Sequence, residues 1–418
     1  MQESVIGARL SAMLILFSNG LLYATWGVSV PLIKSKFDAS EAVLSLAMAA
    51  VALGGIVTMG RAGEWIAQRG SGTACVRTGL MMVFAAAPIL LIPSYPILLI
   101  VLFVYGVATA ANDVAANAQG AHLENLTKKS LIGSLHGSFS VGGLVGALLA
   151  SGWAVSGMPP VANLMSLSAV VCIALLVVAR HLQDEARTSD YPKHAVAGGS
   201  TVARIPRRVR RRLLAFGALA FCALVVEGAF YDWAAVYMRE VVGAPRSWVG
   251  FGYAAFALGM AGGRLFGDWV RNRVTHQFVI AGSGLVGVSG LALILLNSSA
   301  HVAVVGFFVT GLGLSNVIPV LFSSAGRLSI GAALAPSQGL AMTTRVAYVG
   351  LLLGPLFIGP LANVVGLRWS FLLVAVAIGV VCAGWFWLSW RSGGIPWELR
   401  TRIGQPVSSS SGLRVQDE

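Results

Sequence analysis

The chain has 418 residues, of which 56% are hydrophobic and only 11% are charged. Soluble proteins usually carry about 25% charged residues, because a folded chain in water needs a polar surface. This composition excludes an ordinary soluble globule and predicts a protein embedded in lipid. The net charge is +13, but the basic residues form short clusters between apolar runs, so we expect no nucleic-acid partner.

The first apolar run, residues 10–33, is too long for a cleaved signal peptide and predicts a helix that stays in the membrane. A helix needs about 20 residues to cross about 30 Å of hydrocarbon, and further runs of this kind follow along the chain. They are residues 42–60, 74–92, 96–118, 131–153, 160–180, 213–238, 247–266, 277–297, 300–324, 336–361 and 368–390. The sequence therefore predicts an all-α integral membrane protein with about twelve transmembrane helices.

Lysine and arginine are unevenly distributed among the loops between these runs. They are more frequent on the amino-terminal side, and the side richer in positive charge faces the cytoplasm. We therefore expect both termini in the cytoplasm. In this scheme Arg264, Arg271 and Arg273 belong to cytoplasmic loops, residues 181–212 form one long polar cytoplasmic linker, and residues 392–418 form a disordered cytoplasmic tail.

The two halves of the chain repeat one design. Residues 63–69, GEWIAQR, match residues 267–273, GDWVRNR, and the linker lies at the midpoint of the chain. An internal repeat on this scale indicates that each half is one structural unit. The sequence therefore predicts two pseudo-symmetric six-helix bundles, residues 1–180 and residues 213–391.

Glycines recur at intervals of four residues within several of the apolar runs. They are Gly142 with Gly146, Gly350 with Gly354, and the series Gly259, Gly263 and Gly267. Small residues at this spacing let two membrane helices pack closely. We therefore expect these helix faces to be helix–helix contacts.

This plan of two six-helix halves resembles the major facilitator superfamily of transporters over roughly residues 10–390. Residues 112–119, NDVAANAQ, and residues 134–140, SLHGSFS, resemble its fucose-permease-like branch and the uncharacterised bacterial relatives of that branch. The resemblance implies a substrate site near the middle of the membrane, between the two halves of the protein. It also implies that the protein lies in a bacterial inner membrane. The superfamily's loop signature is degraded, because Ala67 and Gln68 occupy its Asp and Arg places.

Few charged side chains lie inside the predicted helices. An ionisable group in hydrocarbon costs about 2.5 to 3.5 kcal/mol on insertion scales, so each one needs a partner or a function. They are Asp113, Glu227, Asp232 and Arg345, with His136 as a titratable neutral residue. Counting along the helices places Glu227 near mid-depth, Asp232 in the outer third and the others in the inner half. We predict that Asp113 and Glu227 include the proton-coupling group.

Polar and aromatic side chains share helix faces with these charges. The predicted substrate-binding residues are Asn19, Tyr23, Trp26, Asn117, His136 and Phe139 in the first half, and Tyr231, Asn316, Arg345 and Tyr348 in the second. Rings can cover a sugar face while amides and carboxylates bind hydroxyls, which favours a small hydroxylated or charged solute. The alternative for any single ring is lipid contact or core packing, and the charged residues could instead form a structural ion pair.

The sequence thus predicts a secondary active transporter that moves a small polar solute by alternating access, coupled to protons. Arg345 would pair with Asp113 or Glu227, or would bind an anionic substrate. The alternative function is a proton-driven efflux pump for small amphipathic compounds.

Other functions fit the sequence less well. Motifs for ATP binding, zinc proteolysis and serine hydrolysis are missing from it, so we expect no enzyme, no cofactor and no metal. A receptor is disfavoured because the short loops leave no room for a further domain. The expected partners are the solute, protons and membrane lipids, and we expect a monomer.

Overall fold

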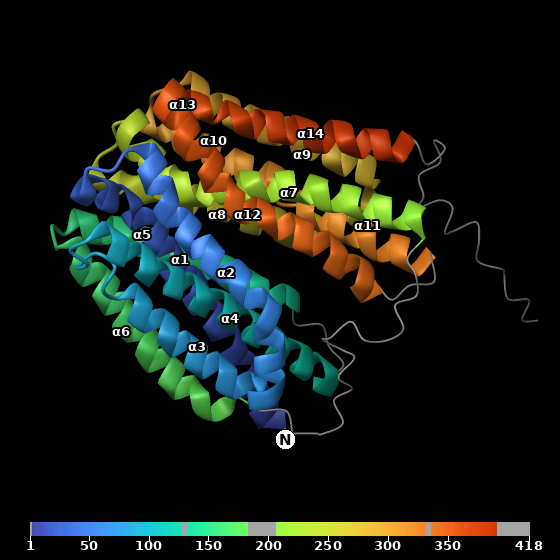
Figure 1. Cartoon of the computed structure of the whole chain (residues 1–418), viewed down its shortest axis with the longest axis horizontal. Coiled ribbons are helices and arrows are strands. Elements are labelled where there is room, and N and C mark those ends of the chain that lie inside the picture. Colours follow the sequence, from blue (N-terminus) through green and yellow to red (C-terminus); the bar gives the residue numbers. More distant parts are fainter. Residues whose placement is uncertain (1, 128–131, 183–205, 332–335, 391–418) are drawn as a thin grey trace, which may run out of the picture.

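A computed structural model describes residues 2–127, 132–182, 206–331 and 336–390. The secondary structure of these residues is helical, and the helices form two bundles that lie side by side (Figure 1). The predicted fold of two six-helix bundles is confirmed. Most of the predicted linker, residues 183–205, and the predicted tail lie outside the described residues.

Each apolar run of the first half corresponds to one helix. These helices are α1 (Gln2–Phe37), α2 (Glu41–Arg69), α3 (Ser71–Ala86), α4 (Tyr95–Thr127), α5 (Ile132–Val155) and α6 (Pro160–Val178), followed by the short turn η1 (Ala179–His181). The prediction for α3 was too long, since it extended to residue 92. Pro88 has no N–H to donate to the carbonyl of Phe84, so the helix ends before it.

The second half repeats this arrangement with more interruptions. Its elements are α7 (Arg207–Val236), η2 (Tyr237–Val241), η3 (Arg246–Trp248), α8 (Val249–Arg273), α9 (His276–Leu296), α10 (Ala300–Leu314), α11 (Val317–Gly331), α12 (Pro336–Val365), α13 (Leu367–Ser370) and α14 (Leu372–Trp390). The run predicted as one helix, residues 300–324, is broken between α10 and α11. Pro319 cannot donate to the carbonyl of Ser315, which explains the break.

Two groups of arginines belong to helices rather than to the predicted linker and loop. The run of residues 207–212 forms the first turns of α7, and Arg264, Arg271 and Arg273 all lie on α8. Arginine is a good helix former, and its long side chain can carry its charge beyond the apolar segment. A helix can therefore continue past the point where hydropathy ends, and the predicted boundaries at 212 and 266 were wrong.

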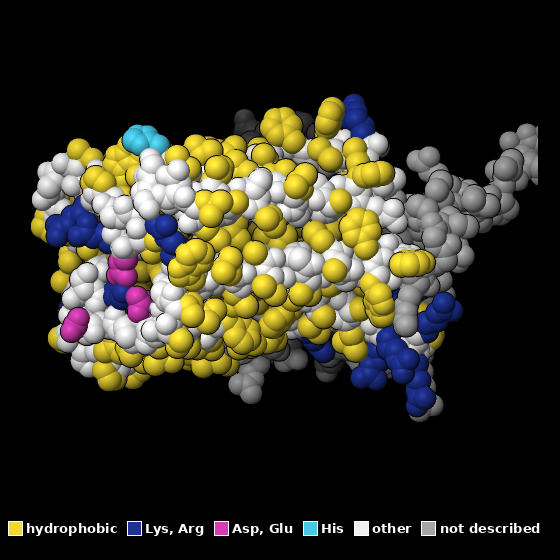
Figure 2. Space-filling view, turned by 90° about the horizontal axis from the view of Figure 1, so that it is seen from above, with side chains coloured by type: hydrophobic (Ala, Val, Ile, Leu, Met, Phe, Trp, Pro, Cys, Tyr) yellow, Lys and Arg dark blue, Asp and Glu magenta, His cyan; other side chains and the backbone are white. Residues whose placement is uncertain are grey.

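The surface of the molecule matches a membrane protein. Figure 2 shows hydrophobic side chains over the middle of one face and charged side chains at its two ends. Among the described residues, ten helical spans are long and apolar enough to cross a membrane, and α3 is a shorter apolar helix. We call the end where α1 begins and α7 begins the linker side, and the end of the α1–α2 connection the far side (Figure 1).

Equivalent helices pack against each other in the two bundles. α1 packs on α5 as α7 packs on α12, and α2 packs on α4 as α8 packs on α10. A Cβ atom on Gly142 would overlap the carbonyl oxygen of Phe17, and one on Gly350 would overlap that of Phe221. The expectation that these glycines mark helix–helix contacts is confirmed, and the backbones touch in both bundles.

This close approach predicts a difference between two glycines of α5. Gly142→Ala should lower the free energy of unfolding by about 1 to 3 kcal/mol, because α1 and α5 must separate to admit the methyl group. Gly137 has no neighbouring atom within 4 Å of a built Cβ, so Gly137→Ala should leave the Tm unchanged or raise it. Thermal unfolding of the purified variants in detergent compares them, and equal Tm values would contradict the packing described.

Candidate functional site

A polar cluster joins the two bundles on the far side. Lys34, near the end of α1, contacts Glu41 of α2 at 2.9 Å and also Glu240 of the second bundle. Close by, the backbone N–H of Ala42 donates to Oδ1 of Asn363 on α12, at 3.3 Å. These contacts hold α1 and α2 against the second bundle.

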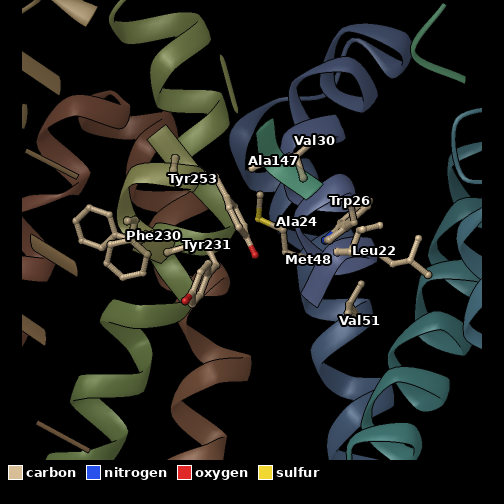
Figure 3. Close-up of a cluster of buried hydrophobic side chains, with 14 of the residues drawn as sticks. Leu22, Ala24, Trp26, Val30, Met48, Val51, Ala147, Phe230, Tyr231 and Tyr253 are labelled. Atoms are coloured by element: carbon tan, nitrogen blue, oxygen red, sulfur yellow. The ribbon is translucent and has the colours of Figure 1, made fainter. Parts of the chain in front are cut away.

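Deeper in the molecule, tyrosines from both bundles meet. The Tyr23 hydroxyl on α1 donates to Oδ1 of Asp232 on α7 over 3.5 Å, and the ring of Tyr23 meets that of Tyr231 edge-on at 6.4 Å between centroids. Tyr231 also packs on Tyr253 of α8, at 5.1 Å between centroids. Figure 3 shows Tyr231 and Tyr253 extending from the second bundle toward α1. The ring of Tyr253 and the backbone carbonyl oxygen of Tyr231 lie beside Gly27, so the interface is closely packed at this level.

Toward the linker side, a charged pair follows one turn along α7. Glu227 accepts a hydrogen bond from Arg264 of α8 at 3.0 Å, and their side chains are 14% and 34% exposed. The hydroxyl of Tyr348 on α12 lies within electrostatic range of this pair and of Asp113 on α4 of the first bundle. We call Asp113, Glu227, Arg264 and Tyr348 the central polar cluster. It brings together side chains of both bundles.

The contacts between the bundles are unevenly distributed along the membrane normal. The hydrogen bonds, the ion pair and the ring contact between the two halves described above lie at the level of Tyr23 and Asp232 or nearer the far side. On the linker side of that level, Asp113 and Tyr348 are both partly exposed. The described structure is therefore closed on the far side, with the central polar cluster on the linker side of the closure.

Three predicted substrate-binding residues of the first half serve contacts within that half. Trp26 is 1% exposed and points away from Tyr231 and Tyr253 (Figure 3). The Asn117 side chain donates to the carbonyl of Asp113 in its own helix at 2.9 Å. Phe139 lies where α5 crosses α1, with its carbonyl oxygen against Gly20.

Of two further predicted residues of the first half, the structure describes the side chain of Asn19 but not that of His136. Asn19 is completely buried, and neither its side-chain nitrogen nor its oxygen has a hydrogen-bond partner among the described residues. His136 is on α5, but its side chain lies outside what the structure describes.

Asn316 occupies the break between α10 and α11. Its side chain accepts a hydrogen bond from Arg271 Nη1 at 2.7 Å and donates to the carbonyl of Gly263 at 3.0 Å. Both partners are on α8, so Asn316 ties the broken helix to its neighbour within the second bundle.

Arg345 does not form the ion pair that the sequence suggested for it. It is exposed on α12, and no carboxylate of the described residues lies within ion-pair distance of it. The partner of Glu227 is instead Arg264, which we had assigned to a loop. Arg264 lies within the glycine series Gly259, Gly263 and Gly267, whose four-residue spacing is typical of a packed membrane helix. This spacing was the signal in the sequence that Arg264 belongs to a helix.

Comparison with known proteins agrees with this architecture. The profile of the Major Facilitator Superfamily matches residues 12–345. The chain belongs to this superfamily. It is 30% identical to an uncharacterized MFS-type transporter of Yersinia pestis over 379 residues, which are 90% of this chain and 95% of that one. It is also 30% identical to the membrane protein MosC of Rhizobium meliloti, over 90% of this chain and 89% of MosC.

Solved structures of superfamily transporters share the fold. A variant of the nucleoside transporter NupG superimposes with a TM-score of 0.73 over 91% of this chain and 99% of its own, at 12% identity. A bacterial homolog of the lysosomal transporter Spinster, in an inward-facing and unoccupied conformation, gives a TM-score of 0.70 over 93% and 98%, at 15% identity. The protein is thus a multi-pass membrane transporter of this superfamily, with its central polar cluster between the two halves.

The charged pair predicts a non-additive effect of mutation. Glu227→Gln or Arg264→Gln alone should lower the free energy of unfolding by about 1 to 3 kcal/mol, because each leaves the other charge unpaired in a partly buried site. The double variant should be more stable than the sum of the two losses indicates. Arg345→Gln is the matched control and should leave the Tm unchanged. Additive losses in a double-mutant cycle would show that the pair does not interact.

Proposed function

We propose that the protein is a secondary active transporter that moves a small polar solute by alternating access, coupled to protons. The observation that supports this most directly is the central polar cluster, to which both halves contribute. In transporters built from two repeats, the substrate site lies at the interface of the repeats, and the halves rock around it. A cluster shared by both halves is therefore able to hold a solute while either side closes.

The chemistry of the cluster favours a cargo with hydroxyl groups or with charges of both signs. Asp113 and Glu227 accept hydrogen bonds, Arg264 donates them, and the Tyr348 hydroxyl does either. A solute that binds there must replace the water around these groups, so it has to offer matching donors and acceptors. Sugars, nucleosides and zwitterionic metabolites meet this requirement.

Proton coupling requires a carboxylate whose protonation state changes during the cycle. Asp113 and Glu227 are the two carboxylates of the central polar cluster and come from opposite halves. We propose that this role is found among them. In the described conformation Glu227 is paired with Arg264, so a proton or a solute that binds Glu227 would have to compete with this arginine.

The proposed placement in the cell follows from charge. The arginine run of residues 207–212 begins α7 on the linker side, and basic residues next to a membrane span favour the cytoplasmic face. We propose that the linker side faces the cytoplasm of a bacterial inner membrane, so that the closed far side faces outward. A single chain supplies both bundles, which supports a monomer as the working unit.

Efflux of small amphipathic compounds is the second candidate. The rings of Tyr23, Tyr231 and Tyr253 form an aromatic layer beside the polar cluster, and such a layer can stack on a flat apolar cargo. The charges of the central polar cluster favour the polar solute over this alternative.

A thermal-shift screen of the purified transporter distinguishes the two cargoes. The panel should contain sugars, nucleosides, polyols, sugar acids, amino acids and amphipathic drugs. A ligand at 100 times its Kd raises the stability of the native state by about 2.7 kcal/mol, and we expect this shift from a hydroxylated or zwitterionic compound. Stabilisation by amphipathic drugs alone would favour efflux. The best compound is then tested for flux into proteoliposomes.

Flux measurements on two variants test the coupling residues. Asp113→Asn and Glu227→Gln should each be assayed for uptake driven by a pH gradient and for exchange without a gradient. We expect at least one of them to lose most gradient-driven accumulation while it keeps exchange, because an amide cannot carry the proton. Wild-type gradient dependence in both variants would exclude the two carboxylates of the central polar cluster from proton coupling.

A further inference from the structure

Asp232 is a buried carboxylate at the contact between the bundles. It is 6% exposed, and the hydrogen bond to it comes from the hydroxyl of Tyr23 on the opposite bundle. No lysine, arginine or histidine of the described residues lies within ion-pair distance of it. The sequence places it in the outer third of its helix, and the predicted site does not include it.

The groups that face Asp232 from other helices are tyrosines of α1 and α8. Tyr23 of α1, Tyr105 of α4 and Tyr253 of α8 lie within electrostatic range of one another, and Asp232 lies within range of Tyr23 and Tyr253. The hydroxyl of Tyr105 is buried without a hydrogen-bond partner among the described residues. On its own helix and on α8, the nearby charges are Glu227 and Arg264, which pair with each other. The nearest ionisable groups from other helices are therefore the phenols of Tyr23 and Tyr253 rather than a cation.

The burial of Asp232 depends on contact between the two halves. Its hydrogen-bond donor Tyr23 belongs to the first bundle, and the contacts from this level to the far side are the ones that close the transporter. An ionised carboxylate without a cation costs several kcal/mol when it is taken from water into a protein interior. A protonated carboxyl group avoids most of this cost and can itself donate a hydrogen bond.

We propose that Asp232 binds the proton that permits the far side to close. This inference rests on the proposed function and adds a third carboxylate to the proton pathway. With the far side open, water reaches the carboxylate and a proton from that water forms an O–H bond with it. With the far side closed, the neutral carboxyl group packs among the tyrosines. Protonation and closure are thus linked, since each favours the other.

A distance measurement across the far side tests this without knowledge of the substrate. Ser156, after α5, and Ser299, before α10, are exposed far-side residues of the two halves. Spin labels at both positions, in protein whose four native cysteines are replaced, report far-side opening by double electron–electron resonance in liposomes. We expect the long-distance population to grow as the pH rises. Asp232→Asn should abolish this pH dependence and keep the far side closed, because the amide is permanently neutral.

Matched variants make each outcome decisive. Asp38→Asn, which neutralises an exposed carboxylate on the far side, is the matched control and should keep the pH-dependent opening. Tyr23→Phe should move the midpoint of the opening to higher pH, because the ionised carboxylate loses its donor and the carboxyl group holds its proton to higher pH. Unchanged pH dependence in Asp232→Asn would overturn the assignment. If Asp113→Asn or Glu227→Gln in the same labelled background abolishes the opening instead, proton coupling stands and Asp232 is excluded. A distance between the two spin labels that does not change with pH in the wild-type background would contradict both this inference and proton coupling.

Discussion

Hydrocarbon accepts apolar helices readily but charged side chains only at several kcal/mol each, and this constraint decides where the polar groups of the transporter lie. Charges gather at the two ends of the molecule (Figure 2), or they are paired inside it, as Glu227 is with Arg264 within the second bundle, while Asp232 meets Tyr23 of the opposite bundle. The interface between the halves is therefore also the polar interior of the protein. The surface able to bind a solute is the one that must open and close.

The division between rigid and separable contacts follows from the residues that make them. Within each bundle, glycines such as Gly142 and Gly350 bring helix backbones into contact, so these helices cannot shift without overlap. Between the bundles, the far-side contacts are hydrogen bonds, tyrosine rings and the ion pair of Lys34 with Glu240. Such contacts can exchange protein partners for water when the halves separate. Each bundle can therefore move as a unit around the central polar cluster.

Much of this fold was predictable from hydropathy, because twelve apolar runs and one internal repeat define two bundles. The errors occurred where local chemistry overrides hydropathy: Pro88 ends α3 early, Pro319 breaks α10 from α11, and α8 continues through its arginines. The site was harder to predict, since an ion pair between neighbouring helices depends on their rotation. The sequence therefore indicated Glu227 correctly as an intramembrane charge but offered Arg345 as its partner in place of Arg264.

A reversible lock on the far side tests the alternating-access account most directly. The Ala42 backbone and the Asn363 side chain are in hydrogen-bond contact, so Ala42→Cys with Asn363→Cys, in protein without the native cysteines, should form a disulfide across the halves. We predict that oxidation abolishes flux of the solute found by screening, that a reductant restores it, and that either single cysteine has no such effect. Full flux through the fully crosslinked protein would contradict the account.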